Sequence, residues 1–199
     1  PEPTSARFGS RCPICLEEWD VNEMPMLRTC CCLEVCKSCE AKIWPMKAPC
    51  PLCRMPAPKS ESEELARLRR HAENDIPEAL KDLADVYRRG GLGLKVSLKK
   101  CAKLYKRAVE LGSVEAMNNL GGMYEVGEGV KLDRKKAMQL YRLCADRGHA
   151  GAQQNLAIEL SRMGSFGEAI RYFKLAAAQG LSVAEFSLGA RLYNGEEME

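Results

Sequence analysis

The chain repeats its own pattern about every 36 residues, and this period constrains the fold more than any other feature. An alanine opens each copy, with spacings of 37, 36 and 32 residues, and apolar residues follow four and eight positions later. This stripe keeps one helix face apolar, and the small alanine lets a neighbouring helix approach closely. The four stripes are Ala79, Leu83 and Tyr87; Ala116, Leu120 and Tyr124; Ala152, Leu156 and Leu160; and Ala184, Leu188 and Leu192.

A second helix in each copy is indicated by a pair of large residues and a closing glycine. A glycine just past a helix end adopts the left-handed conformation that closes the helix. Helix pairs of this kind stack on their neighbours to form a solenoid. The sequence therefore predicts a mostly α protein with an α-α solenoid. The large pairs are Leu104 and Tyr105, Leu140 and Tyr141, and Tyr172 and Phe173, and the glycines are Gly112, Gly148 and Gly180.

The predicted solenoid covers residues 77–195, and shorter segments flank it. A capping helix is expected within 62–76, with Leu65 and Leu68 on one face up to about Glu73. The missing second helix after Gly195 favours a fragment of a longer protein. The units are 77–112, 113–148, 149–180 and a partial 181–195; the linker is 55–61, and the tails are 1–11 and 196–199.

The second unit resembles the Sel-one-like repeat, a relative of the tetratricopeptide repeat. It reads A-M-N-N-L-G-G-M-Y-E-V-G-E-G-V-K-L-D-R-K-K-A-M-Q-L-Y, whereas G-S-F-G-E-A-I-R-Y-F-K-L-A in the third unit is more similar to the tetratricopeptide form. The resemblance implies that partners bind on a concave face lined by the first helices. We call the alanine that opens each copy the frame alanine. The polar residues three positions after each frame alanine are candidates for the partner contact. Alternatively, they form hydrogen bonds to neighbouring repeats or face solvent. These residues are Asp82, Asn119, Asn155 and Ser187.

Nine of the eleven cysteines fall in one short segment between Cys12 and Cys53. A disulfide scaffold is one explanation, but the chain shows no signal peptide and has a large cysteine-poor part. Pairs of cysteines separated by two residues suit tetrahedral zinc, and the segment has few large apolar residues to stabilise it otherwise. We therefore predict two structural zinc ions, without which this segment unfolds.

The spacing of the cysteines resembles the RING finger, with its two interleaved zinc sites. The resemblance covers roughly residues 9–57 and implies a small zinc-stabilised α+β domain at residues 12–54. This chain has Leu33 where a histidine often falls, so it is similar to the all-cysteine variant. The implied ligands are Cys12, Cys15, Cys36 and Cys39 for the first zinc, and Cys30, Cys32 (or Cys31), Cys50 and Cys53 for the second.

Four residues match positions through which RING-type ubiquitin ligases bind a ubiquitin-conjugating enzyme. They are Ile14, Trp44, Pro51 and Arg54. The resemblance implies that Arg54 positions ubiquitin and that no covalent intermediate forms on this chain, since holding enzyme and ubiquitin together is enough. Alternatively, Trp44 fills a small core and Arg54 is a solvated charge.

Composition excludes several other functions. A net charge of +3, spread evenly along the chain, argues against nucleic acid, and no apolar stretch is long enough to span a membrane. The sequence contains neither a set of nucleophile, histidine and carboxylate nor a phosphate-binding glycine loop. It therefore does not indicate hydrolase or kinase chemistry. We interpret the chain as an intracellular ubiquitin ligase, cytoplasmic or nuclear, whose repeats bind a substrate or adaptor. The alternative is a non-catalytic interaction scaffold; the substrate, the conjugating enzyme, the chain linkage and the oligomeric state stay open.

Overall fold

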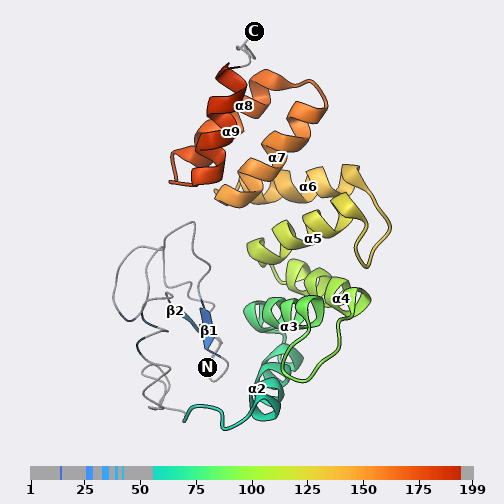
Figure 1. Ribbon diagram of the computed structural model, residues 1–199. Helices are drawn as coiled ribbons and strands as arrows, with labels where there is room; N and C mark the ends of the chain where they lie inside the picture. Colours follow the sequence, from blue (N-terminus) through green and yellow to red (C-terminus); the bar gives the residue numbers. More distant parts are fainter. Residues whose placement is uncertain are drawn as a thin grey trace.

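The described part of the protein consists of successive helices stacked into a solenoid, preceded in the sequence by a short β-hairpin (Figure 1). The computed structural model describes residues 14, 26–28, 33–35, 39, 42 and 56–193. The eight helices in this part confirm the predicted mostly α solenoid. They are α2 (Glu61–Glu73), α3 (Pro77–Arg89), α4 (Leu98–Glu110), α5 (Val114–Val126), α6 (Arg134–Ala145), α7 (Ala150–Arg162), α8 (Phe166–Ala177) and α9 (Ser182–Tyr193).

The hairpin consists of β1 (Met26–Arg28) and β2 (Leu33–Val35), which pair antiparallel. Met26 lies opposite Val35, and Arg28 lies opposite Leu33. In the sequence, the three adjacent cysteines Cys30, Cys31 and Cys32 fall between these strands. The backbone of β1 lies beside that of α3, so the hairpin adjoins the first helix of the solenoid.

Local sequence explains where several helices begin. The Ser60 side chain accepts a hydrogen bond from the Glu63 amide at the start of α2, and Pro77 occupies the first turn of α3. Ser113 caps α5, and Asp133 caps α6 in the same way. Each cap satisfies an amide that the first helical turn would leave without a partner.

The core follows the repeat period. All four frame alanines are fully buried, so the predicted small contact positions are confirmed; they are Ala79, Ala116, Ala152 and Ala184. The second helices contribute Tyr105, Tyr141 and Phe173, which are also buried. Helix α2 covers the first unit with Leu65, Leu68 and Ala72, which belong to the same apolar cluster as Ala79.

The turns between units close as the glycine pattern predicts. Gly112, Gly148 and Gly180 have φ angles of 89°, 82° and 81°, which place them in the left-handed region that favours glycine. No helix in the part of the chain that the structure describes has the length and apolar character needed to cross a membrane.

Another glycine in α5 is required for packing. A Cβ atom on Gly121 would lie 2.6 Å from Cε1 of the Tyr141 ring, whereas one on Gly122 would lie 3.6 Å from the Tyr141 hydroxyl. The first distance is a clash with a fully buried ring, and the second is an ordinary contact. Gly121 therefore lets α5 and α6 approach each other over Tyr141.

These two neighbouring glycines form a matched pair for a stability test. We expect Gly121→Ala to lower the free energy of unfolding by about 1–3 kcal/mol, because the new methyl group displaces a buried ring. Gly122→Ala should raise it by up to about 1 kcal/mol, since alanine is the better helix former. Urea denaturation of both variants measures the difference. Equal effects of the two substitutions would contradict this account of Gly121.

Candidate functional site: the polar row of the first helices

Four half-buried polar residues, which we call the polar row, lie on successive first helices. Asp82 lies on α3, Asn119 on α5, Asn155 on α7 and Ser187 on α9. Each comes three residues after a buried frame alanine, so the helix period places each of them beside the core and not on the outermost surface. The structure thus places the predicted residues at equivalent positions of the repeats.

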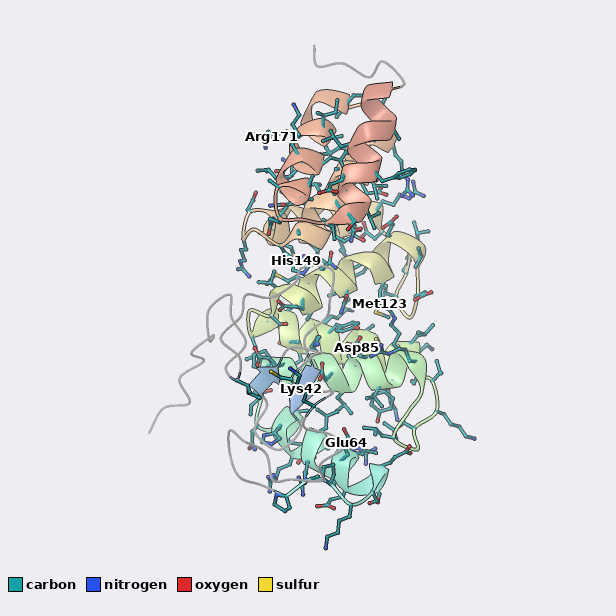
Figure 2. The ribbon with its side chains drawn as sticks, turned by 60° about the vertical axis from the view of Figure 1, so that its left-hand side comes forward. Lys42, Glu64, Asp85, Met123, His149 and Arg171 are labelled. Atoms are coloured by element: carbon teal, nitrogen blue, oxygen red, sulfur yellow. The ribbon has the colours of Figure 1, made fainter. Side chains whose placement is uncertain are left out.

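Asp82 and Asn119 belong to one polar network that joins α3, α4 and α5. The Asp82 carboxylate lies 2.6 Å from Nζ of Lys81, a buried lysine that is only 5% exposed. The same ammonium group lies 4.0 Å from Asp85, which accepts a hydrogen bond from the Tyr105 hydroxyl. Nδ2 of Asn119 donates to that hydroxyl oxygen at 3.3 Å. Figure 2 shows Asp85 within the lower repeats.

The network changes the acidity of its members. Burial raises the pKa of Asp82 above its ordinary value, and the neighbouring Lys81 ammonium only partly opposes this effect. Burial also raises the pKa of Tyr105, and the Asp85 carboxylate adds to the shift because it stabilises the neutral phenol. The Tyr105 hydroxyl therefore stays protonated and serves as a permanent donor to Asp85.

The upper members of the polar row make different contacts. Nδ2 of Asn155 donates to Oδ1 of Asn118 at 3.0 Å and so connects α7 directly to α5. The Ser187 hydroxyl donates to the backbone carbonyl of Val183, 2.8 Å away in its own helix. The four residues therefore do not form one continuous hydrogen-bonded cluster.

A second network joins α5, α6 and α7. Glu125 accepts a hydrogen bond from the Tyr141 hydroxyl at 2.9 Å and lies 2.7 Å from Nη1 of Arg162. Arg162 also pairs with Glu159, a carboxylate that is only 3% exposed. Burial alone would raise the pKa of Glu125, but the hydrogen bonds from Arg162 and Tyr141 hold it below its ordinary value.

Sequence reasoning predicted Asp82 but missed the two acids that accept hydrogen bonds from the tyrosines, Asp85 and Glu125. Tyr105 and Tyr141 occupy equivalent repeat positions, but Asp85 precedes its tyrosine by 20 residues and Glu125 precedes its tyrosine by 16. Because the acids do not recur at a fixed offset, the repeat pattern carries no signal for them. From the sequence, Tyr105 and Tyr141 are predicted only to be core residues.

Asn119 and Asn155 each retain side-chain hydrogen-bonding groups that a ligand could use. Each amide uses one donor in the contacts above, and an asparagine side chain offers two donors and a two-fold acceptor. Within the described residues, neither carbonyl oxygen accepts a hydrogen bond. Two half-buried amides on α5 and α7 are thus held in place and keep polar groups that suit a partner's backbone.

Most of the predicted zinc-site residues lie outside the described part of the chain. Cys39 is buried, at 7% exposure, and Ile14 is half-buried. Among the residues that the structure describes, no group of three or more histidine, cysteine, aspartate or glutamate side chains is placed to hold a metal ion. The predicted residues outside the description are Cys12, Cys15, Cys30, Cys31, Cys32, Cys36, Trp44, Cys50, Pro51, Cys53 and Arg54.

The remaining cysteines and His149 have structural roles. Cys101 and Cys144 are fully buried, and burial raises the pKa of Cys101 to about 11 and that of Cys144 to about 12. Both thiols therefore stay protonated, which makes them poor metal ligands and poor nucleophiles. His149 accepts a hydrogen bond from the Ala152 amide at the start of α7, and burial lowers its pKa.

The two tyrosine hydroxyl groups are expected to contribute differently to stability. We expect Tyr105→Phe to lower the free energy of unfolding by about 1–3 kcal/mol, because buried Asp85 loses the hydroxyl donor and its ion pair with Lys81 is long, at 4.0 Å. Tyr141→Phe should cost about 1 kcal/mol, since Glu125 retains Arg162. Urea denaturation at pH 7 checks both values, and a larger loss for Tyr141→Phe would contradict the assignment.

Comparison with known proteins agrees with this architecture. The chain matches the Sel1 repeat family over residues 77–113, 114–149 and 151–181, which together make up just over half of its length. A search of curated proteins gives no match.

Two solved structures share the fold. A Sel1 repeat protein from Oxalobacter formigenes is 25% identical, with a TM-score of 0.61 over 69% of this chain and 58% of that one. The protein c5321, a protective antigen of uropathogenic Escherichia coli strains that displays an SLR fold, is 28% identical, with a TM-score of 0.63 over 70% of this chain and 30% of that one. Matched repeats, helix pairs and fold together show that the chain belongs to the Sel1 repeat family.

Proposed function

We propose that this protein is an interaction scaffold whose Sel1 repeats bind a partner protein along the polar row. Sel1 repeats generally suggest protein partners. The observation that carries the proposal is the pair of half-buried amides at Asn119 and Asn155, each held by a hydrogen bond between helices. An extended segment of a partner presents backbone donors and acceptors that such amides satisfy.

The fixed positions of the amides favour binding. Asn119 is held through Tyr105 and Asp85, and Asn155 is held by Asn118, so little side-chain freedom is lost when a partner binds. The amides are neutral, and they therefore impose little desolvation cost compared with a charged group. Their spacing across consecutive repeats suits a partner that lies along the solenoid.

The test is a double substitution on the polar row. We expect Asn119→Ala with Asn155→Ala to weaken binding of a purified partner about tenfold or more, because two hydrogen bonds are lost. The partner is first isolated with the native chain and identified, and isothermal titration calorimetry then compares the variants. The matched control is Lys103→Ala with Gln139→Ala, which changes two exposed residues on α4 and α6. Unchanged affinity in the polar-row variant would reject this surface.

We further propose that residues 12–54 form a RING-type domain that recruits a ubiquitin-conjugating enzyme, which would make the protein a ubiquitin ligase. The specific observation is the spacing of the nine cysteines together with Ile14, Trp44, Pro51 and Arg54. Two described features support it: Cys39 is buried, and a short hairpin brackets the three adjacent cysteines in the sequence. In this proposal the polar row binds the substrate or adaptor.

The cysteine chemistry defines what zinc would do there. Eight thiolates in two tetrahedral sets would stabilise a segment that has few large apolar side chains. Catalysis would come from positioning a charged conjugating enzyme, with Ile14 and Trp44 as apolar anchors and Arg54 bridging to ubiquitin. The ninth cysteine is surplus, and Cys31 and Cys32 are the two candidates.

Zinc content and ubiquitin transfer test this second proposal separately. We expect two zinc ions per native chain, and one fewer after Ser replaces the true ligand among Cys31 and Cys32. A chelator should release both ions while the helical circular dichroism signal of the solenoid persists, because the described solenoid core contains no metal cluster. Ubiquitin-chain formation with a panel of conjugating enzymes should be lost in Ile14→Ala and Arg54→Ala.

The outcomes are distinct. Absence of bound zinc would reject the RING-type domain. Bound zinc without ubiquitin transfer by any enzyme in the panel would leave the scaffold function alone, with a structural metal domain.

A further inference from the structure

A basic pocket that includes no residue of the polar row lies beside the loop between α5 and α6. It has a volume of about 710 Å³ and lies between α4, the end of α5 and the loop that leads into α6. Five cationic residues and one acidic residue line it. The lining residues are Lys106, Tyr124, Gly129, Val130, Lys131, Leu132, Asp133, Arg134, Lys135 and Lys136.

The charges in the pocket are poorly compensated. Its single carboxylate, Asp133, caps α6 and lies 3.5 Å from Nζ of Lys136, so it is already engaged. Within the described part of the chain, no carboxylate lies within 4 Å of Lys106, Lys131 or Lys135. These lysines are exposed. The pocket therefore holds several positive charges that attract an anionic group.

The pocket also has an apolar component. Leu132 is 55% exposed, and Val130 beside it is half-buried. The half-buried Tyr124 ring lies under two ammonium groups, with Nζ of Lys136 at 5.6 Å and Nζ of Lys106 at 5.9 Å from its centroid. These contacts hold two of the cations over the ring. Apolar surface and positive charge are thus combined in one hollow.

The first unit carries a related set of residues. Tyr87 is the equivalent of Tyr124, and Nζ of Lys100 lies 5.1 Å from its ring centroid, as Lys136 does for Tyr124. Lys95 and Lys99 match Lys131 and Lys135 in the sequence. Figure 1 shows the α3–α4 and α5–α6 loops on the same edge of the solenoid. The basic character therefore extends over two neighbouring units.

The third unit lacks this feature. Its helices are joined by residues 163–165 alone, and α8 begins Phe166-Gly167-Glu168, with no lysine in this stretch. The positive edge thus has a defined length of two units, and it ends where the loop shortens. A positive surface of limited length that contains a concave pocket can bind a short segment of a partner protein.

We propose that this basic pocket binds an acidic peptide segment of a partner protein that also carries apolar side chains. Glu or Asp residues pair with the lysines, and an apolar side chain packs against Leu132. Single-stranded nucleic acid fits less well, because base stacking needs free aromatic faces and the Tyr124 ring already lies under two lysines. The pocket and the polar row have no residue in common, so this inference is independent of the polar row.

Fluorescence anisotropy with a labelled ten-residue peptide of alternating Glu and Leu tests the proposal. We expect Lys131→Glu with Lys135→Glu to weaken binding about tenfold or more, and Lys131→Gln with Lys135→Gln to weaken it less. Raising the salt concentration should weaken binding by the native chain. The matched control is Arg69→Glu with Lys174→Glu, which changes the net charge equally at exposed positions elsewhere and should retain binding. Circular dichroism verifies that each variant is folded.

Several results would overturn the proposal. These are no binding of the Glu–Leu peptide, equal binding of a Gln–Leu peptide, or equal losses in the pocket and control variants. Tighter binding of a ten-nucleotide oligothymidine or of phosphatidylserine vesicles, removed by the pocket substitutions, would assign the pocket to those ligands instead. Asn119→Ala with Asn155→Ala should leave peptide binding unchanged, so failure of the polar row and failure of the pocket are distinguishable.

Discussion

Close packing of helices over small residues is the constraint on which the rest of the structure depends. No single unit can bury its apolar stripe alone, so each first helix has to contact the helices before and after it. The fully buried frame alanines allow this approach, and Gly121 does so where the Tyr141 ring fills the space. Since the packing repeats, the residues of the polar row lie at equivalent positions of successive first helices, although their contacts differ.

Polar networks add specificity to that packing. Tyr105 and Tyr141 bury their rings in the core and direct their hydroxyl groups to carboxylates on the first helix of the same unit. Each network then reaches the next unit, through Asn119 in one case and Arg162 in the other. A buried carboxylate with its donor removed is costly, so these contacts favour one relative arrangement of the repeats. Asn119 and Asn155 therefore stabilise the fold in addition to their proposed role in partner binding.

Two surfaces of different chemistry result. The polar row offers neutral amides on the first helices, whereas the basic pocket offers lysines and Leu132 beside the α5–α6 loop. Such a scaffold can bind one partner through two contacts, and linked contacts strengthen each other when both are reachable. If residues 12–54 recruit a conjugating enzyme, these surfaces would set which protein is presented to it.

The sequence by itself determined the helix pairs, the closing glycines and the buried alanines, because these depend on local backbone preference and on a period that repeats along the chain. It also placed the polar row at equivalent positions. Only the tertiary structure decided which acids face Tyr105 and Tyr141, because Asp85 and Glu125 have no common offset from them. It also decided that Lys106 of α4 joins the loop lysines in one pocket, since that contact depends on how neighbouring units stack and not on local sequence.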